Sequence, residues 1–167
     1  MMKLPSKLLA SFALALAAIL AATAIPGAAQ NAAPAAEQLL YLPIYSHIYY
    51  GELDRKGQPN DKLLSVHVSI RNTDMRNSIK VMYARYYDTD GKLLKEYLAT
   101  PRTIPPLGTA ELFVPRSDAS GGSGANFLIA WKADAGVNPP LAEAIHTEFE
   151  VGRTLIFTTQ GQPIKAR

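Results

Sequence analysis

Three histidines are the side chains of this sequence with the widest chemical range. Imidazole is a common metal ligand, so His47, His67 and His146 could converge on a metal ion if their strands met. No two of them lie at the spacing of a metal-binding motif, and each falls on the parity of its strand that we expect to face outward. The sequence therefore predicts three separate surface histidines and no metal site.

A short acidic run has some features of a calcium loop. Asp88 and Asp90 precede a glycine and Glu96 follows it, and hard cations prefer carboxylates at alternate positions before a glycine turn. The first and last ligand positions of such a loop would be Tyr86 and Tyr97, so the pattern fails at both ends. A tight hairpin turn explains the run without a metal.

Neither an anion-binding loop nor a catalytic nucleophile has a recognisable pattern. The glycine run 121–124 could present backbone amides to an anion, but a predicted strand follows it instead of a helix, and no phosphate-binding lysine follows. We expect a flexible loop there. The chain has no cysteine, Ser123 lies outside a G-x-S-x-G elbow, and Ser46 and His47 point to opposite faces of a strand.

Residues 1–29 have the layout of a secretory signal peptide. Lys3 and Lys7 precede an apolar run, and small residues follow it. We expect cleavage after Ala29, with Ala24 as the second choice. A retained anchor helix is the alternative, although the apolar run is shorter than the roughly 20 residues that span a membrane. Residues 30–38 would form a flexible linker in an exported protein, periplasmic or secreted.

Charge and cysteine content exclude several classes of protein. Without Lys3 and Lys7 the chain has 15 basic and 14 acidic side chains, scattered singly, so no nucleic-acid-binding face is predicted. The absence of cysteine rules out a disulfide and a lipoprotein cleavage site. We expect a soluble exported domain without membrane contact once the leader is removed.

The element around which the chain is organised is a pair of predicted strands over residues 63–72 and 78–88. The polar residues of the first strand alternate with aliphatic ones, as in a half-buried strand. We expect the second strand to return beside the first and to turn tightly into a third strand over residues 92–98. The aliphatic positions of the first strand are Leu64, Val66, Val68 and Ile70.

Further strands are predicted on both sides of this pair. Pro43 makes the first of them an edge or bulged strand, and Trp131 should be the largest core side chain. Residues 51–62 should form a solvated loop and the proline-rich residues 100–108 a crossing between sheets. The strands are expected at residues 39–50, 109–114, 126–133, 141–151 and 154–159.

Seven to eight short strands, with no convincing helix in the mature chain, predict an all-β, immunoglobulin-like β-sandwich; a small barrel is the alternative. The one competing helix covers residues 141–149. We favour a strand there because its apolar residues alternate. The sandwich forms one domain over residues 39–160, followed by a C-terminal tail at 161–167.

Four stretches resemble a known family. They are YLPIYSHIY at 41–49, SIRNTD at 69–74, YYDTDGKL at 86–93 and GGSGANF at 121–127. Together they are similar to a family of small bacterial secreted domains filed as a domain of unknown function, over residues 40–160. The resemblance implies an exported bacterial protein. It carries over no catalytic or binding residue, because the family has no established activity.

Two functions are compatible with the sequence. The preferred one is a non-catalytic module, without cofactor, that binds a protein, glycan or small ligand, because no pair of titratable groups has a spacing that demands chemistry. The alternative is a small periplasmic hydrolase or metal-dependent enzyme, with a site made by His47, Asp90 and the glycine run.

A predicted stripe of rings carries the binding hypothesis. If the aliphatic parity of residues 39–50 faces the core, the other parity is an outward row of amphipathic rings, a type of side chain enriched in binding surfaces. The alternative is that a loop such as residues 100–108 covers them. On the surface reading, Tyr45→Ala and Tyr49→Ala leave stability nearly unchanged. The row consists of Tyr41, Tyr45, His47 and Tyr49.

Overall fold

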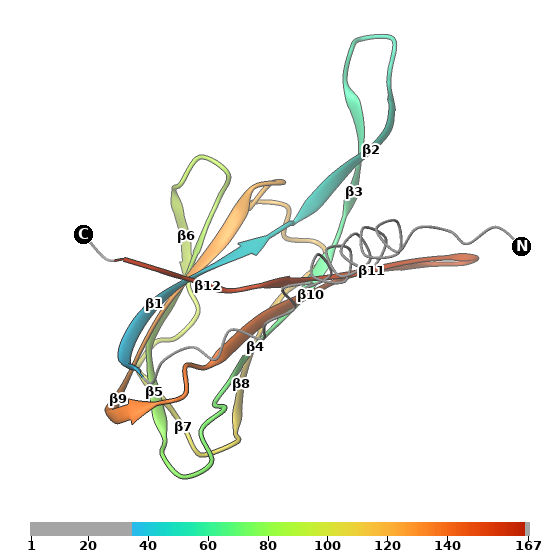
Figure 1. The fold of residues 1–167 in the computed structure, drawn as a ribbon. Coiled ribbons are helices and arrows are strands. Elements are labelled where there is room, and N and C mark those ends of the chain that lie inside the picture. The colour runs from blue at the N-terminus through green and yellow to red at the C-terminus, as the bar shows by residue number, and fades with distance from the viewer. Residues whose placement is uncertain (1–34, 166–167) are drawn as a thin grey trace, which may run out of the picture. The chain divides into compact units, whose positions relative to one another are not determined.

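The computed structural model describes residues 35–165, which form twelve strands without a helix. A six-stranded and a four-stranded sheet pack together, and a separate two-stranded hairpin extends from them (Figure 1). The predicted all-β sandwich is confirmed, divided into more strands than the seven or eight expected. The predicted signal peptide lies outside the described residues.

The first sheet has the strand order β12-β1-β9-β5-β6, with β7 also paired to β5. All of its pairings are antiparallel. Its strands are β1 (Ala35–Ile44), β5 (Ile79–Tyr87), β6 (Leu93–Glu96), β7 (Arg102–Ile104), β9 (Ala125–Val137) and β12 (Gln162–Ile164).

The second sheet has the order β11-β10-β4-β8 and is also antiparallel. Its register places Ile145 of β10 between His67 and Thr158 of the neighbouring strands. The strands are β4 (Ser65–Arg71), β8 (Thr109–Val114), β10 (Leu141–Glu150) and β11 (Arg153–Gln160).

The core lies between the two sheets and follows the alternation of the strands. Trp131 on β9 is the largest fully buried side chain, as predicted. Burying a large apolar side chain stabilises a protein by about 1.5 to 3 kcal/mol, so the inward residues hold the sheets together. On β1 and β4 they are Leu40, Leu42, Ile44, Val66, Val68 and Ile70.

Two hairpins extend beyond the rest of the sheets in Figure 1. The first arm is the hairpin of β2 (His47–Leu53) and β3 (Pro59–Leu63), which forms a sheet of its own. The second arm is the end of the β10–β11 hairpin, residues 148–156. The start of β2 lies in the strand predicted at 39–50, but residues 51–53 and 59–62 of the predicted solvated loop are strand, so the loop prediction was wrong for these segments.

The predicted pairing of residues 63–72 with residues 78–88 is wrong. The first of these strands is β4 in the second sheet, whereas the other is β5 in the first sheet, so the loop between them crosses the sandwich. Buried Asn72 fixes this crossing, because its side-chain amide donates hydrogen bonds to the carbonyls of Asn77, Ile104 and Pro105. A strand with one buried face has the same sequence pattern whether the other strand is its neighbour in the same sheet or faces it from the opposite sheet.

Other connections follow the prediction. The Asp88 to Gly91 turn joins β5 to β6 as an antiparallel pair, with Gly91 at a φ of 80°. The proline-rich segment 100–108 crosses from the first sheet to the second, and it contributes the short strand β7 on the way. The φ of 80° at Gly91 in the β5–β6 turn is one that glycine adopts without steric strain.

The folded part extends beyond the expected limits at both ends. Strand β1 begins at Ala35, inside the segment predicted as a linker at 30–38. Strand β12 lies in the predicted tail, and it pairs with β1 so that Ile164 faces Leu39. Both segments are strands because a neighbouring strand pairs with them, β9 with the start of β1 and β1 with β12.

Candidate functional site

The structure does not place the four predicted binding residues in one row. Strand β1 ends at Ile44, and the chain bends at Tyr45 and Ser46 before β2 begins. Tyr41 is exposed on β1, whereas His47 and Tyr49 lie on the first arm with their rings 5.1 Å apart. These residues lie in three environments: β1, the bend between β1 and β2, and the first arm. Their role in binding stays a prediction.

His146 is buried, although the sequence predicted a surface histidine. Its Nε2 accepts a hydrogen bond from the backbone N–H of Tyr45 at 3.1 Å, and its ring stacks on Phe157 with centroids 4.5 Å apart. An accepting Nε2 requires a neutral ring with its proton on Nδ1. Burial lowers the pKa of His146 to about 4, against an opposite effect of the Phe157 and Ala144 backbone groups. His146 therefore fixes the bend between β1 and β2.

Tyr45 is part of this cluster, and we expect Tyr45→Ala to cost about 1 to 2 kcal/mol of folding free energy. Its ring packs edge-on against His146 at 5.6 Å and Phe157 at 5.7 Å, and such pairs contribute about 0.5 to 1.5 kcal/mol beyond burial. Tyr49 is 57% exposed, so Tyr49→Ala should change stability by less than about 0.5 kcal/mol. Urea denaturation would compare the two; equal midpoints would contradict the packing of Tyr45.

The other two histidines, His47 and His67, are only partly buried. His67 lies on the outer face of β4 with Nε2 3.4 Å from Glu111 Oε1, and His47 contacts Tyr49. Within residues 35–165, no group of three or more metal-ligating side chains is assembled.

The glycine run 121–124 packs against the first sheet and the β1–β2 bend. The Gly122 carbonyl accepts the Ser46 N–H at 3.0 Å, the Gly121 carbonyl accepts the Thr89 hydroxyl at 3.1 Å, and the Gly124 N–H donates to that hydroxyl at 3.0 Å. Behind the run, the hydroxyls of Ser46 and Tyr86 share a buried hydrogen bond of 2.7 Å. The hydrogen bonds to Ser46 and Thr89 hold the glycine run in place beside the first sheet and the β1–β2 bend.

The alternative enzyme site is not assembled by hydrogen bonds. Ser46 and Thr89 contact the glycine run, but among the described residues no hydrogen bond joins it to His47 or to the Asp90 side chain. The carboxylate of Asp88 accepts the backbone N–H groups of Asp90 and Lys92. This carboxylate completes its own turn, as the hairpin interpretation predicted.

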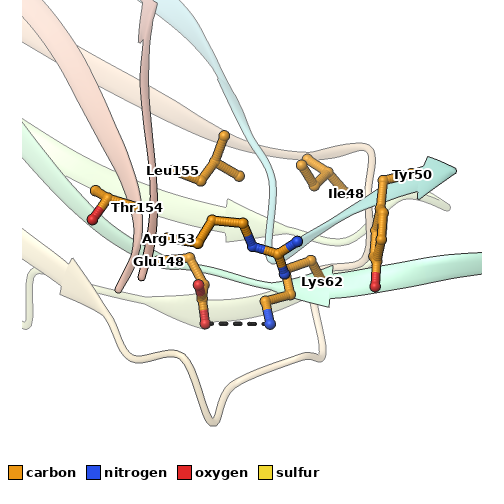
Figure 2. Close-up of a pocket in the computed structure, with 7 residues that line it drawn as sticks. All are labelled: Ile48, Tyr50, Lys62, Glu148, Arg153, Thr154 and Leu155. Atoms are coloured by element: carbon orange, nitrogen blue, oxygen red, sulfur yellow. Dashed lines mark ion pairs between the residues drawn. The ribbon is translucent and has the colours of Figure 1, made fainter. Parts of the chain in front are cut away.

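A cavity of about 210 Å³ lies between the two arms, and we call it the inter-arm cavity (Figure 2). Ile48 and Tyr50 line it from the first arm and Leu155 from the second, so its walls are largely apolar. Ile48 pairs with Lys62 and Leu155 pairs with Glu148, which places these charged groups on the same faces of their hairpins. The remaining lining residues are Lys62, Glu148, Arg153 and Thr154.

A network of charges forms one side of this cavity. The Glu148 side chain is only 2% exposed; its Oε1 lies 3.1 Å from Arg116 Nη1 and 3.6 Å from Lys62 Nζ. Lys62 also binds Glu150, which lies 3.4 Å from Arg153. These hydrogen bonds to Lys62 and Arg153 lower the pKa of the exposed Glu150 carboxyl.

Glu148 is incompletely satisfied in this network. Its Oε1 is buried and accepts no hydrogen bond of good geometry among the described residues, despite the two nearby cations. A buried charge persists in a protein only when opposite charges compensate it. The pair Lys62 and Arg116 therefore makes a buried carboxylate possible beside an apolar cavity.

Sequence reasoning missed all of these residues. Lys62 was assigned to a loop, and Glu148 shares the strand parity of His146, which was predicted to face outward. No sequence signal identifies them, because their relation appears only in the register of β4 with β10: continued past Ser65 and Thr147, this register brings Lys62 opposite Glu150.

The arms also carry exposed apolar side chains. Monomeric proteins rarely expose large contiguous apolar patches, and those they expose are often interaction sites. Of these side chains Tyr50 lines the inter-arm cavity, whereas Ile156 lies on the face of β11 opposite to Leu155. The exposed apolar residues of the arms are Tyr49, Tyr50 and Leu53 on the first arm and Phe149, Val151 and Ile156 on the second.

Comparison with protein families gives one clear result. The model of a family described as "Protein of unknown function (DUF3124)" matches residues 37–164. The chain belongs to the DUF3124 family. This confirms the resemblance to an uncharacterised family. The matched residues run from Glu37 in β1 to Ile164 at the end of β12, so the match covers part of every strand of both sheets and both arms.

Other comparisons add little to the DUF3124 assignment. The crystal structure of Thermotoga maritima 1070 is 13% identical, with a TM-score of 0.40, and the match covers 75% of this chain and 92% of that one. No curated protein matches the chain. Within residues 35–165, no helix is long and apolar enough to cross a membrane.

Proposed function

We propose that this DUF3124 protein is an exported bacterial binding module, periplasmic or secreted, that acts without catalysis through its inter-arm cavity. The leader at residues 1–29 supports export, because a basic start, an apolar run and small residues are the signals read by the secretion machinery. The cavity supports binding.

The observation that carries the proposal is the combination of an open apolar cavity with a charged side. Ligand sites are concave and mainly apolar, with a few polar groups that fix orientation. Ile48, Tyr50 and Leu155 supply the apolar walls, and the network around Glu148 supplies the polar groups. The first arm is a separate two-stranded sheet, and the second arm lies beyond the last pair of β10 with β4, Thr147 with Ser65, so ligand contacts on the arms lie away from the core.

Selection from a displayed library of random hexapeptides on the immobilised protein tests this function. We expect enrichment of binding peptides on the wild type and its loss on Leu155→Asp, because a carboxylate in the apolar wall would be desolvated by the ligand at a cost of several kcal/mol. The matched control is Ile156→Asp. This neighbour on β11 is 54% exposed and points to the opposite face.

Ile156→Asp should enrich peptides as the wild type does, provided that circular dichroism shows both variants folded. Absence of enrichment on the wild type would contradict the binding function. Enrichment that survives Leu155→Asp would also contradict it, since binding would then occur elsewhere.

A further inference from the structure

We propose that the inter-arm cavity binds an extended peptide segment of a partner protein that carries a carboxylate beside an apolar side chain. This inference rests on the proposed binding function and adds the chemistry of the partner. It follows from the size of the cavity, from its charge and from the position of Arg153.

The size of the cavity favours part of a larger partner over a free small molecule. Pockets for drug-sized ligands measure about 300 to 1,000 Å³, whereas this cavity measures about 210 Å³. Its wall residue Tyr50 is also 45% exposed, and Val151 is fully exposed at the tip of the second arm. A segment that inserts one side chain and lies along the arms would use both features.

The charge of the cavity favours an anion. Three cations, Lys62, Arg116 and Arg153, surround two carboxylates, Glu148 and Glu150, through the contacts described above. One positive charge therefore remains in the network. A carboxylate from the partner would balance it, whereas a lysine or arginine would add to the excess, and like charges in a desolvated site repel strongly.

Arg153 is the group that would receive the carboxylate. It lines the cavity and its side chain is 61% exposed. Among the described residues its ion pair is with Glu150, through Nη2 at 3.4 Å, and Glu150 is bound by Lys62 as well. A guanidinium has five N–H donors and binds carboxylates in a bidentate manner, so donors remain for a ligand. Figure 2 shows Arg153 and Lys62 reaching from the two arms into the same space.

The peptides selected on the wild-type protein supply the test. We expect aspartate or glutamate to be enriched next to an apolar residue. Fluorescence anisotropy of one selected peptide, acetylated and amidated, should show about tenfold weaker binding when its acidic residue is changed to glutamine, as expected for loss of a charge-assisted hydrogen bond. A version with glutamine and a free C-terminal carboxylate distinguishes a side-chain carboxylate from a chain terminus.

Arg153→Gln should remove the preference for the acidic peptide over its glutamine version. Lys92→Gln, which removes the same charge at the exposed β5–β6 turn, should retain it. Cavity-dependent peptides without acidic residues, or with a preference for lysine, would overturn the inference and leave the binding function standing. A preference unchanged by Arg153→Gln would overturn it as well. Absence of any selected peptide would contradict the binding function itself.

Discussion

Gly121→Ala is expected to destabilise the folded protein by about 3 kcal/mol, the upper end of the cost of overpacking a core. A Cβ atom at this position would lie 1.9 Å from Tyr86 Oη and 2.6 Å from Ser46 Oγ. Both residues are fully buried and hydrogen-bonded to each other, so neither can move aside without loss of that bond. Urea denaturation measures the effect.

Two controls separate this clash from a general effect of replacing glycine. Gly91→Ala adds a methyl group in open space at a positive φ, and backbone strain of this kind costs only about 1 to 2 kcal/mol. Tyr86→Phe removes the nearest clashing atom, so in the Gly121→Ala background it should recover part of the lost stability. If Gly121→Ala were no worse than Gly91→Ala, the close packing of the glycine run would be refuted.

The stability of the protein is expected to fall between pH 6.5 and about pH 4 because of His146. Its pKa is about 4 in the folded protein against 6.5 for an ordinary histidine, so in this range the unfolded chain binds a proton that the folded chain does not. The free energy of unfolding then decreases as the pH decreases, by up to about 3 kcal/mol. Below about pH 4 both states are protonated and this contribution no longer changes.

Denaturation midpoints of the wild type and His146→Leu across this range measure the effect. The variant should be less stable at pH 7, because the Tyr45 N–H loses its acceptor, but it should lack this share of the pH dependence. His67→Gln, at a partly exposed histidine outside this cluster, is the comparison variant. A wild-type slope that persists in His146→Leu would show that other groups cause it.

His146 also shows what strand periodicity can predict. Alternation on β10 was recognised correctly, but it identifies two faces without saying which is buried. The face with Ile145 and Phe149 is the more apolar one, yet the buried face has Ala142, Ala144, His146 and Glu148. Small residues and a hydrogen-bonded histidine suit this face because β1 lies against it, and that contact depends on the tertiary fold.

The candidate site was beyond sequence reasoning for a related reason. Strand β4 and Trp131 were predicted correctly, since a strand with one buried face carries a clear pattern. The first arm has no buried face of its own, so its polar residues, including Lys62, have the composition of a loop. The network of Lys62, Glu148 and Arg153 joins residues far apart in the chain, and only the pairing of β10 with β4 and β11 brings them together.

Strand β12 has a consequence for edge-to-edge pairing of the first sheet with another molecule. It covers the backbone of β1 over Leu39 to Tyr41, a stretch that would otherwise offer unpaired groups to a second molecule. Its central residue is Pro163, and proline on an edge strand presents no N–H to an incoming strand. The first sheet therefore ends at β12 in a residue that cannot extend it, which guards this edge against growth into sheets between molecules.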